Sequence, residues 1–197
     1  MSNWNWNKFT QKTQTRQPIG FLIEAVRILG LSNGNALDLG CGAGIDARYL
    51  AENGFNVEAI DFNKESVEQT KKFCKGLSVS VNQKNVADYN IIPNAYQLII
   101  AWNTLSFLTK DESRKILLNI QEGLIKDGIF VFSLFGQEDD WVKNHPEMSF
   151  WTIEELKNLL FNVNFIKLCE EKRIKPGVTG QVKFWHLIRG IIQKKTV

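Results

Sequence analysis

The chain has 197 residues, of which 44% are apolar and 23% are charged, and it carries a formal net charge of +3. This balance is typical of a globular protein with one core and excludes a disordered chain. The charge is too small to indicate a nucleic-acid-binding protein by itself, because such proteins carry a concentrated basic stripe.

Short apolar runs and scattered cysteines argue against further classes. The longest apolar runs, 98–102 and 129–135, are far shorter than the ~20 residues that a membrane helix needs. The first seven residues contain no basic segment followed by an apolar one, so we expect no signal peptide. Cys41, Cys74 and Cys169 form no CxxC pair, which disfavours a disulfide framework or a zinc site. We therefore expect a soluble, cytoplasmic protein without a bound metal.

Helix and strand patterns alternate along the chain after about residue 18. Pro18 fits the first turn of a helix that Gly30 ends. The segment 97–102 is nearly continuous in apolar residues, as in a strand buried on both faces. The predicted strands are 35–39, 56–60, 77–82, 97–102, 128–135, 164–169 and 182–192, with helices at 46–53 and 64–75 and further helices that begin after Thr109 and Thr152.

Two helix starts carry a specific signal. Thr109 with Glu112, and Thr152 with Glu155, match the capping box, in which each side chain bonds the backbone of the other residue. No long helix separates the last two predicted strands, so we expect them to form an antiparallel hairpin at the sheet edge. The alternation as a whole predicts an α/β fold with a doubly wound, mainly parallel sheet.

A glycine-rich segment lies directly between the first predicted strand and its helix. Residues 38–44 read Asp-Leu-Gly-Cys-Gly-Ala-Gly. Glycines at such a turn allow positive φ and let backbone amides approach a ligand closely. Asp61 ends the next strand, where a carboxylate can accept hydrogen bonds from ribose hydroxyls. This order predicts a nucleotide-type cofactor at the carboxyl ends of the strands.

This pattern alone fits either a dinucleotide or another nucleotide-type cofactor. Gly42, Gly44 and Ala47 loosely satisfy the dinucleotide pattern G-x-G-x-x-G/A. Three features disfavour a dinucleotide. Asp38 lies two residues before the first glycine, where it can meet an ammonium group, and a single glycine loop in 197 residues leaves no second domain for a hydride-transfer substrate. The two closing strands, 164–169 and 182–192, suit a seven-stranded sheet with a reversed last strand.

The same residues resemble a known family. Segment 38–44 resembles the first motif of the class I S-adenosylmethionine-dependent methyltransferases, and Asp61 resembles their second motif. Within that superfamily, 135–141 and 183–186 are similar to the tellurite-resistance type of methyltransferase. The resemblance implies a Rossmann-like, seven-stranded, mainly parallel sheet whose last strand is antiparallel, formed by a single domain over 18–197.

The resemblance also implies a binding site for S-adenosyl-L-methionine. Backbone groups of the glycine loop would contact the amino-acid end of the cofactor, Asp38 would orient the loop or the ammonium group, and Asp61 would bind both ribose hydroxyls. Phe62 and Asp88 would meet the adenine; the alternatives are a core phenylalanine and a solvated turn aspartate. The implied cofactor residues are Asp38, Gly40, Cys41, Gly42, Gly44, Asp61, Phe62, Asp88, Ala101, Trp102 and Asn103.

Aromatic residues and one histidine are candidates for the methyl-acceptor site. Aromatic faces suit a sulfonium cation, and we expect Trp4, Trp6, Trp141 and Trp185 to line that site, although each could equally be a core residue. His186 alternates with Trp185 along the last strand, so one of the two faces inward. His186 is the candidate general base; the alternative is a strand histidine with a backbone partner.

The sequence points to a small-molecule methyl acceptor. Residues 103–106, after the fourth predicted strand, read Asn-Thr-Leu-Ser. Enzymes that methylate exocyclic amines of nucleic acids usually carry a D/N-P-P-Y/F/W segment at this position. We expect a soft nucleophile, such as a thiol or a tellurium or selenium oxyanion, or a small metabolite. An NAD-dependent oxidoreductase and a cofactor-binding domain without catalytic activity are the alternatives.

The first 17 residues are expected to form an arm outside the main domain. They are rich in Asn, Gln and Thr, yet they carry Trp4, Trp6 and Phe9. This composition suits a segment that closes over a ligand and excludes water. The alternative is a terminus whose aromatic side chains pack permanently on the domain.

Overall fold

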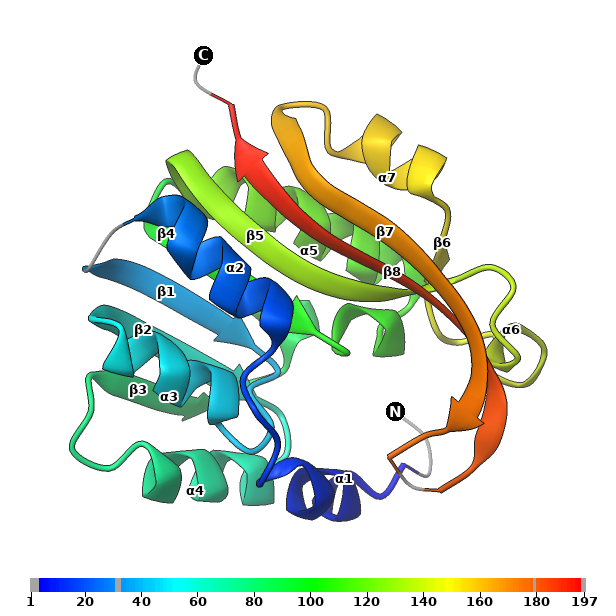
Figure 1. Cartoon of the computed structure of the whole chain (residues 1–197), viewed down its shortest axis with the longest axis horizontal. Helices are drawn as coiled ribbons and strands as arrows, with labels where there is room; N and C mark the ends of the chain where they lie inside the picture. The colour runs from blue at the N-terminus through cyan, green and yellow to red at the C-terminus, as the bar shows by residue number, and fades with distance from the viewer. Residues whose placement is uncertain (1–3, 31–32, 179, 196–197) are drawn as a thin grey trace.

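A central β-sheet lies between two layers of helices in the computed structural model, which describes residues 4–30, 33–178 and 180–195 (Figure 1). The sheet has the order β3-β2-β1-β4-β5-β8-β7, and the short β6 pairs beside β5. The strands are β1 Gly34–Leu39, β2 Phe55–Asp61, β3 Val79–Gln83, β4 Tyr96–Trp102, β5 Leu124–Gly136, β6 Phe150–Trp151, β7 Val163–Pro176 and β8 Val182–Lys194. The helices are α1 Trp6–Thr13, α2 Gly20–Leu29, α3 Ile45–Glu52, α4 Lys64–Phe73, α5 Lys110–Gly123, α6 Trp141–Asn144 and α7 Ile153–Leu159, with 3₁₀ turns η1 Val86–Asp88 and η2 Leu105–Phe107.

The predicted α/β fold with a doubly wound, mainly parallel sheet is confirmed. Strands β3, β2, β1, β4 and β5 pair in parallel, and β8 runs antiparallel to both β5 and β7. The sequence did not predict β6, because this strand is only two residues long and pairs with the last two residues of β5. A strand of that length carries no periodic signal.

Alternation along the central strands divides the core into two halves. Ala36 and Leu98 face α2, α3 and α4, whereas Leu37 and Ile99 face α5 and α7; all four side chains are fully buried. A strand with apolar residues on both faces is what a sheet covered by helices on both sides requires. The same arrangement leaves only the ends of the strands free to form a site.

The helix starts follow the sequence signals, with one exception. Thr109 and Thr152 both make the full capping box with the glutamate three residues on. The placement of Pro18 in the first turn of a helix is wrong, because α2 begins at Gly20 with Ile19 as its N-cap. Pro18 therefore lies just before the helix, where its fixed φ guides the chain into the first turn.

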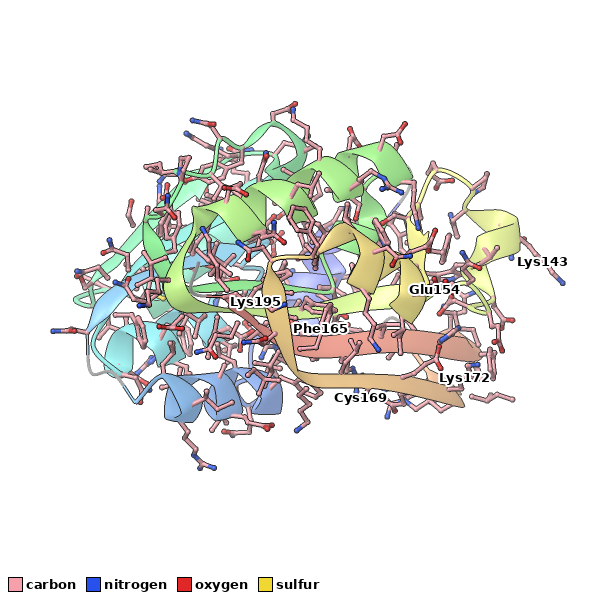
Figure 2. All side chains as sticks on the ribbon, turned by 90° about the horizontal axis from the view of Figure 1, so that it is seen from above. Lys143, Glu154, Phe165, Cys169, Lys172 and Lys195 are labelled. Atoms are coloured by element: carbon pink, nitrogen blue, oxygen red, sulfur yellow. The ribbon has the colours of Figure 1, made fainter. Side chains whose placement is uncertain are left out.

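The hairpin formed by β7 and β8 is longer than predicted and extends past the rest of the sheet (Figure 1). Pairing runs from Val163–Lys194 to Pro176–Val182, whereas the sequence predicted that the first of these strands ends at Cys169. The missed half alternates exposed and half-buried polar residues and has no apolar stripe. Figure 2 places Phe165, Cys169 and Lys172 in succession along β7 at the sheet edge.

The direction of the chain reverses between β1 and β4. From β1 the chain moves outward through β2 and β3, and it then crosses back to β4 on the other side of β1. In open α/β sheets this reversal creates a crevice at the carboxyl ends of the strands. The far end of the hairpin curves toward the N-terminal segment on this side of the molecule (Figure 1).

Candidate active site

The glycine loop, residues 40–44, connects β1 to α3 and is held by the end of β2. The amides of Gly40 and Cys41 donate to the carbonyl oxygen of Ile60 at 2.8 and 3.0 Å. Gly40, Gly42 and Gly44 all have positive φ, of 80°, 54° and 80°, which other residues adopt only with strain. The loop therefore presents its backbone, rather than side chains, to the crevice.

The three glycines differ in what surrounds them. A Cβ added at Gly40 would collide with the side chain of Thr104, and one at Gly44 would lie 2.8 Å from Thr70 Cγ2. A Cβ at Gly42 would meet no heavy atom within 4 Å. Packing within the protein thus explains the first and third glycines, whereas Gly42 leaves space that a bound molecule can occupy.

Asp61, at the end of β2, fixes the glycine loop from the other side. Its Oδ2 accepts a hydrogen bond from the Gly42 amide at 2.9 Å, and its Oδ1 accepts one from the Asn63 amide at 2.8 Å. Burial raises the pKa of this carboxyl above its usual range. A carboxylate oxygen can accept more than one hydrogen bond, so both oxygens keep acceptor capacity for hydroxyl groups of a ligand.

Asp38, at the end of β1, lies behind the loop. It is 4% exposed, and its Oδ2 has no hydrogen-bond partner among the described residues. Burial and the nearby Asp46 raise the pKa of Asp38 well above its usual range. An unpaired buried carboxylate is costly, so this orphaned acceptor is consistent with a donor group of a ligand at the loop.

Two adjoining cavities open at the carboxyl ends of the strands. We call the first the loop cavity, because it contains the glycine loop and Asp61, and the second the aromatic cavity. The loop cavity is lined by Trp6, Phe9, Thr10, Gly40, Gly42, Asp61, Phe62, Ser66, Asn85, Val86, Trp102, Asn103, Thr104, Phe107 and Leu108. The aromatic cavity is lined by Trp4, Asn5, Trp6, Phe9, Asn103, Phe107, Phe135, Trp141, Lys175, Pro176, Gly177, Val178, Gln181, Trp185, Leu187 and Arg189.

The two cavities share one wall. Trp6, Phe9, Asn103 and Phe107 line both of them. Asn103 follows β4 in a left-handed conformation with φ 53°, and Ser133 Oγ donates to its Oδ1 at 3.1 Å. Non-glycine residues held in this conformation cluster at functional sites. The two cavities are therefore adjacent, and molecules bound in them would lie on either side of these shared residues.

A buried lysine lies behind two rings of the aromatic cavity. Lys183 is 5% exposed and forms an ion pair with Asp139. Its Nζ lies 3.9 Å from the ring centroids of both Trp141 and Trp185, within the range of cation–π attraction. Burial lowers the pKa of Lys183. The pair fixes the orientation of the two rings, since each ring packs against the same ammonium group.

The structure brings six of the predicted cofactor residues together. These are Gly40, Gly42, Asp61, Phe62, Trp102 and Asn103, all of which line the loop cavity. Asp38, Cys41, Gly44 and Ala101 do not line it. Gly44 is the N-cap of α3, the thiol of Cys41 contacts Thr70 Oγ1 at 3.5 Å, and Ala101 is fully buried in the core.

Asp88, which was expected to meet the adenine, does not line the loop cavity. Its side chain is exposed and accepts a hydrogen bond from Asn85 Nδ2 at 3.3 Å. The turn η1 directs Asn85 and Val86 into the loop cavity instead. The sequence alone could not show which residue of this turn lines the cavity, because each of residues 85–88 can reach a ligand from a turn.

The four predicted tryptophans line the aromatic cavity, whereas His186 does not. Strand alternation places Trp185, Leu187 and Arg189 on the cavity face of β8 and His186 on the opposite face. There His186 Nδ1 accepts from the Glu138 amide at 3.1 Å, and Nε2 lies 2.6 Å from Glu170 Oε1. Both ring nitrogens are occupied, so the expected general base has no geometric support.

Sequence reasoning missed several residues of the aromatic cavity. Lys175 and Arg189 come from the two strands of the hairpin, and Phe107 comes from η2. Alternation from Trp185 through Leu187 would have identified Arg189. Lys175 carried no such signal, because the sequence did not predict that the preceding strand reaches it.

Similarity to solved structures shows the class of fold. The crystal structure of TehB from Haemophilus influenzae matches with a TM-score of 0.79 and 22% identity, over 95% of this chain and 66% of that chain. A structure of a SAM-dependent methyltransferase from Methanosarcina mazei matches with a TM-score of 0.69 and 18% identity, over 92% of this chain and 100% of that chain. The chain therefore has the Rossmann-like fold of these methyltransferases.

Sequence comparison shows the family. Residues 3–173 match the family model of the tellurite resistance protein TehB, and the chain belongs to this family. A relative from Haemophilus influenzae, named probable S-adenosyl-L-methionine-dependent methyltransferase TehB, is 30% identical over 117 residues, which cover 58% of this chain and 40% of that protein. A ubiquinone biosynthesis O-methyltransferase from Rickettsia canadensis is 29% identical over 98 residues, which cover 49% of this chain and 41% of that protein. The matches thus span less than half the length of these curated relatives.

Replacing Asp61 tests the loop cavity directly. We expect Asp61→Ala to weaken binding of S-adenosylhomocysteine by about 1.5–3 kcal/mol, because a charged acceptor is removed from partly buried hydroxyl groups. Calorimetry measures the affinity, and urea unfolding measures stability, which we expect to fall by about 1 kcal/mol because the amides of Gly42 and Asn63 lose their acceptor. Asp111→Ala, at an exposed position in α5, is the matched control. Unchanged affinity in Asp61→Ala would remove Asp61 from the site.

Proposed function

We propose that the chain is an S-adenosyl-L-methionine-dependent methyltransferase that transfers a methyl group to a small molecule bound in the aromatic cavity. One observation carries the proposal: the loop cavity and the aromatic cavity share the wall formed by Trp6, Phe9, Asn103 and Phe107. Two reactants bound on either side of this wall are neighbours, and holding them in line is a large part of catalysis of a displacement reaction.

The loop cavity supplies the groups that S-adenosylmethionine requires. Gly42 leaves open space at the loop backbone, and Asp61 offers its oxygens to ribose hydroxyls. Phe62 lines the cavity and would pack against the adenine, and Asp38, which is buried behind the glycine loop with one unpaired oxygen, would orient the loop or the ammonium group. The bound cofactor supplies an electrophilic methyl group on a sulfonium cation. Similarity to relatives named as methyltransferases supports this assignment.

The aromatic cavity supplies a dry, ordered site for the methyl acceptor. Trp4 and Trp141 lie edge to face with ring centroids 4.6 Å apart, and Trp6 and Phe107 lie edge to face at 4.9 Å. Rings at this spacing exclude water, and those on the shared wall present their faces to the sulfonium cation of a cofactor in the loop cavity. The acceptor we propose is a soft nucleophile, such as a thiol or a tellurium or selenium oxyanion, or a small metabolite, and not a nucleic acid.

The proposal includes two structural units and a cellular location. Residues 1–17 would act as a lid and 18–197 as the catalytic domain, which the position of α1 against both cavities supports. The described part of the chain contains no helix that is both long and apolar enough to cross a membrane. Cys41, Cys74 and Cys169 are free thiols, which suits the reducing cytoplasm.

Calorimetry and a turnover assay test the function. Tighter binding of S-adenosylhomocysteine than of NAD is expected, and the opposite order would favour the NAD-dependent oxidoreductase instead. Purified protein should then methylate at least one member of a panel of thiols, oxyanions and amines. Binding of S-adenosylhomocysteine without any methylated product across the panel would favour a cofactor-binding domain without catalytic activity.

A further inference from the structure

Among its described lining residues, the aromatic cavity contains two cations and no acidic side chain. Lys175 of β7 and Arg189 of β8 both line it. The described lining residues also include no His, Cys or Tyr, so no imidazole, carboxylate, thiol or phenol is available in the cavity to remove a proton. The remaining titratable amine in the described lining is Lys175, and in the charged form that would hold an anion it cannot accept a proton.

Charge around the two cations is only partly balanced. Glu171 forms ion pairs with both Arg189 and Arg173, so one carboxylate serves two guanidinium groups. The Nε of Arg189 is buried and has no hydrogen-bond partner among the described residues. An unsatisfied buried donor is costly, and a ligand that accepts from it would remove this cost.

Lys175 is the third cation in this group, together with Arg173 and Arg189. No ion pair or hydrogen bond of its ammonium group is found within the described ranges, and its backbone carbonyl accepts from Trp185 Nε1 at 2.9 Å. Burial and the neighbouring Arg173 lower the pKa of Lys175. Both effects would be offset by an anion in the cavity, because an opposite charge favours the charged form of the lysine.

We infer that the methyl acceptor is an organic monoanion with an apolar body, a carboxylate or a thiolate, held by Lys175 and Arg189 and already ionised when it binds. This inference rests on the proposed function. Four Trp and three Phe residues line the cavity and suit a hydrocarbon or aromatic body. A strongly hydrated inorganic oxyanion would lose its hydration there, and it has no apolar surface whose contact with the rings would offset that cost.

The chemistry balances without a proton transfer. A lone pair on the anionic oxygen or sulfur forms the new bond to the methyl carbon, while the carbon–sulfur bond breaks and its electron pair returns to sulfur. The anion and the sulfonium cation become a methyl ester or a methyl thioether and a neutral sulfide. Arg189 lies 5.6 Å from the ring centroid of Trp102, which lines the loop cavity, so the anion would be held next to the cofactor.

The first test compares two ligands of the same shape. We expect protein saturated with S-adenosylhomocysteine to bind benzoate roughly 10-fold more tightly than the neutral benzamide. Lys175→Met should remove most of this preference, and Lys175→Arg should retain it. Lys172→Met is the matched control: Lys172, which Figure 2 labels, lies three residues before Lys175 on β7 and therefore on the opposite face of the strand. Its ammonium group pairs with Glu138 at 2.7 Å. Arg189→Gln should repeat the result of Lys175→Met.

Turnover distinguishes the two sources of the anion. Phenylacetate and thiophenol represent the carboxylate and the thiolate, and mass spectrometry identifies the methyl ester or the thioether; either product supports the inference. Equal affinity for benzoate and benzamide would overturn it, as would methylation of tellurite or selenite with no methylation of either aromatic anion. Failure to bind S-adenosylhomocysteine at all would instead reject the proposed function.

Discussion

Gly42→Val is expected to abolish detectable binding of S-adenosylhomocysteine while leaving a folded protein. A Cβ added at Gly42 meets no heavy atom within 4 Å, and Gly42 lines the loop cavity, so the valine side chain would extend into that cavity. A β-branched side chain occupies that space rigidly. We expect a loss of affinity of about 100-fold or more, equivalent to roughly 2.7 kcal/mol, as measured by calorimetry.

Backbone strain must be separated from occupation of the cavity. Gly42 has φ 54°, and a non-glycine residue there costs about 1–2 kcal/mol of stability. Gly76→Val is the matched control, because Gly76 also has positive φ, of 83°, and also has no atom within 4 Å of an added Cβ. Both variants should lose similar stability in urea unfolding, but only Gly42→Val should lose affinity. Normal affinity in folded Gly42→Val would mean that the glycine loop does not contact the cofactor.

The order of the elements and the position of the glycine loop could be read from the sequence because they depend on local patterns. Buried strands show continuous apolar runs, capping boxes mark Thr109 and Thr152, and glycines with positive φ have few substitutes. The same patterns placed Asp61 beside Gly42, since parallel strands bring their carboxyl ends to one edge.

The remainder of the site depends on long-range placement. Which of two alternating residues on β8 faces the cavity is decided by pairing with β5 and β7, so His186 and Trp185 could not be distinguished beforehand. The length of the hairpin is set by pairing between polar strands, and this pairing brings Lys175 to the cavity. Neither the face of β8 that meets the cavity nor the length of the hairpin can be predicted from local sequence.

Removing the aromatic part of the N-terminal arm is expected to reduce turnover by about 100-fold, because reactants that are no longer held in line lose rate steeply. Trp6 and Phe9 line both cavities and Trp4 lines the aromatic cavity. The arm docks through a buried hydrogen bond between Thr10 and Ser66, whose oxygens are 2.8 Å apart. These contacts describe a closed arm and fit both a lid and a permanently packed terminus.

The end point of the truncation decides whether the experiment is informative. Arg16 forms an ion pair with Asp46, a buried carboxylate in the first turn of α3 that also accepts from the Ile19 amide at 3.0 Å. Removing Arg16 would leave this charge without its partner, which is strongly destabilising. Deletion of residues 2–13 keeps the pair, so any loss of stability then reports on the arm alone.

Thr10→Val provides a graded version of the same test. It keeps the size of the side chain but removes the hydrogen bond to Ser66, which should cost about 1–3 kcal/mol of docking free energy. If the arm is a lid, this variant and the 2–13 deletion should both lower turnover, and the deletion should lower it more. The melting temperature without cofactor should fall by only a few degrees, about the effect of 1 kcal/mol on a domain of this size. Added S-adenosylhomocysteine should raise the melting temperature of the parent more than that of either variant, since only the parent closes fully over the ligand. A large drop in the melting temperature of the unliganded deletion variant would instead identify the arm as part of the core.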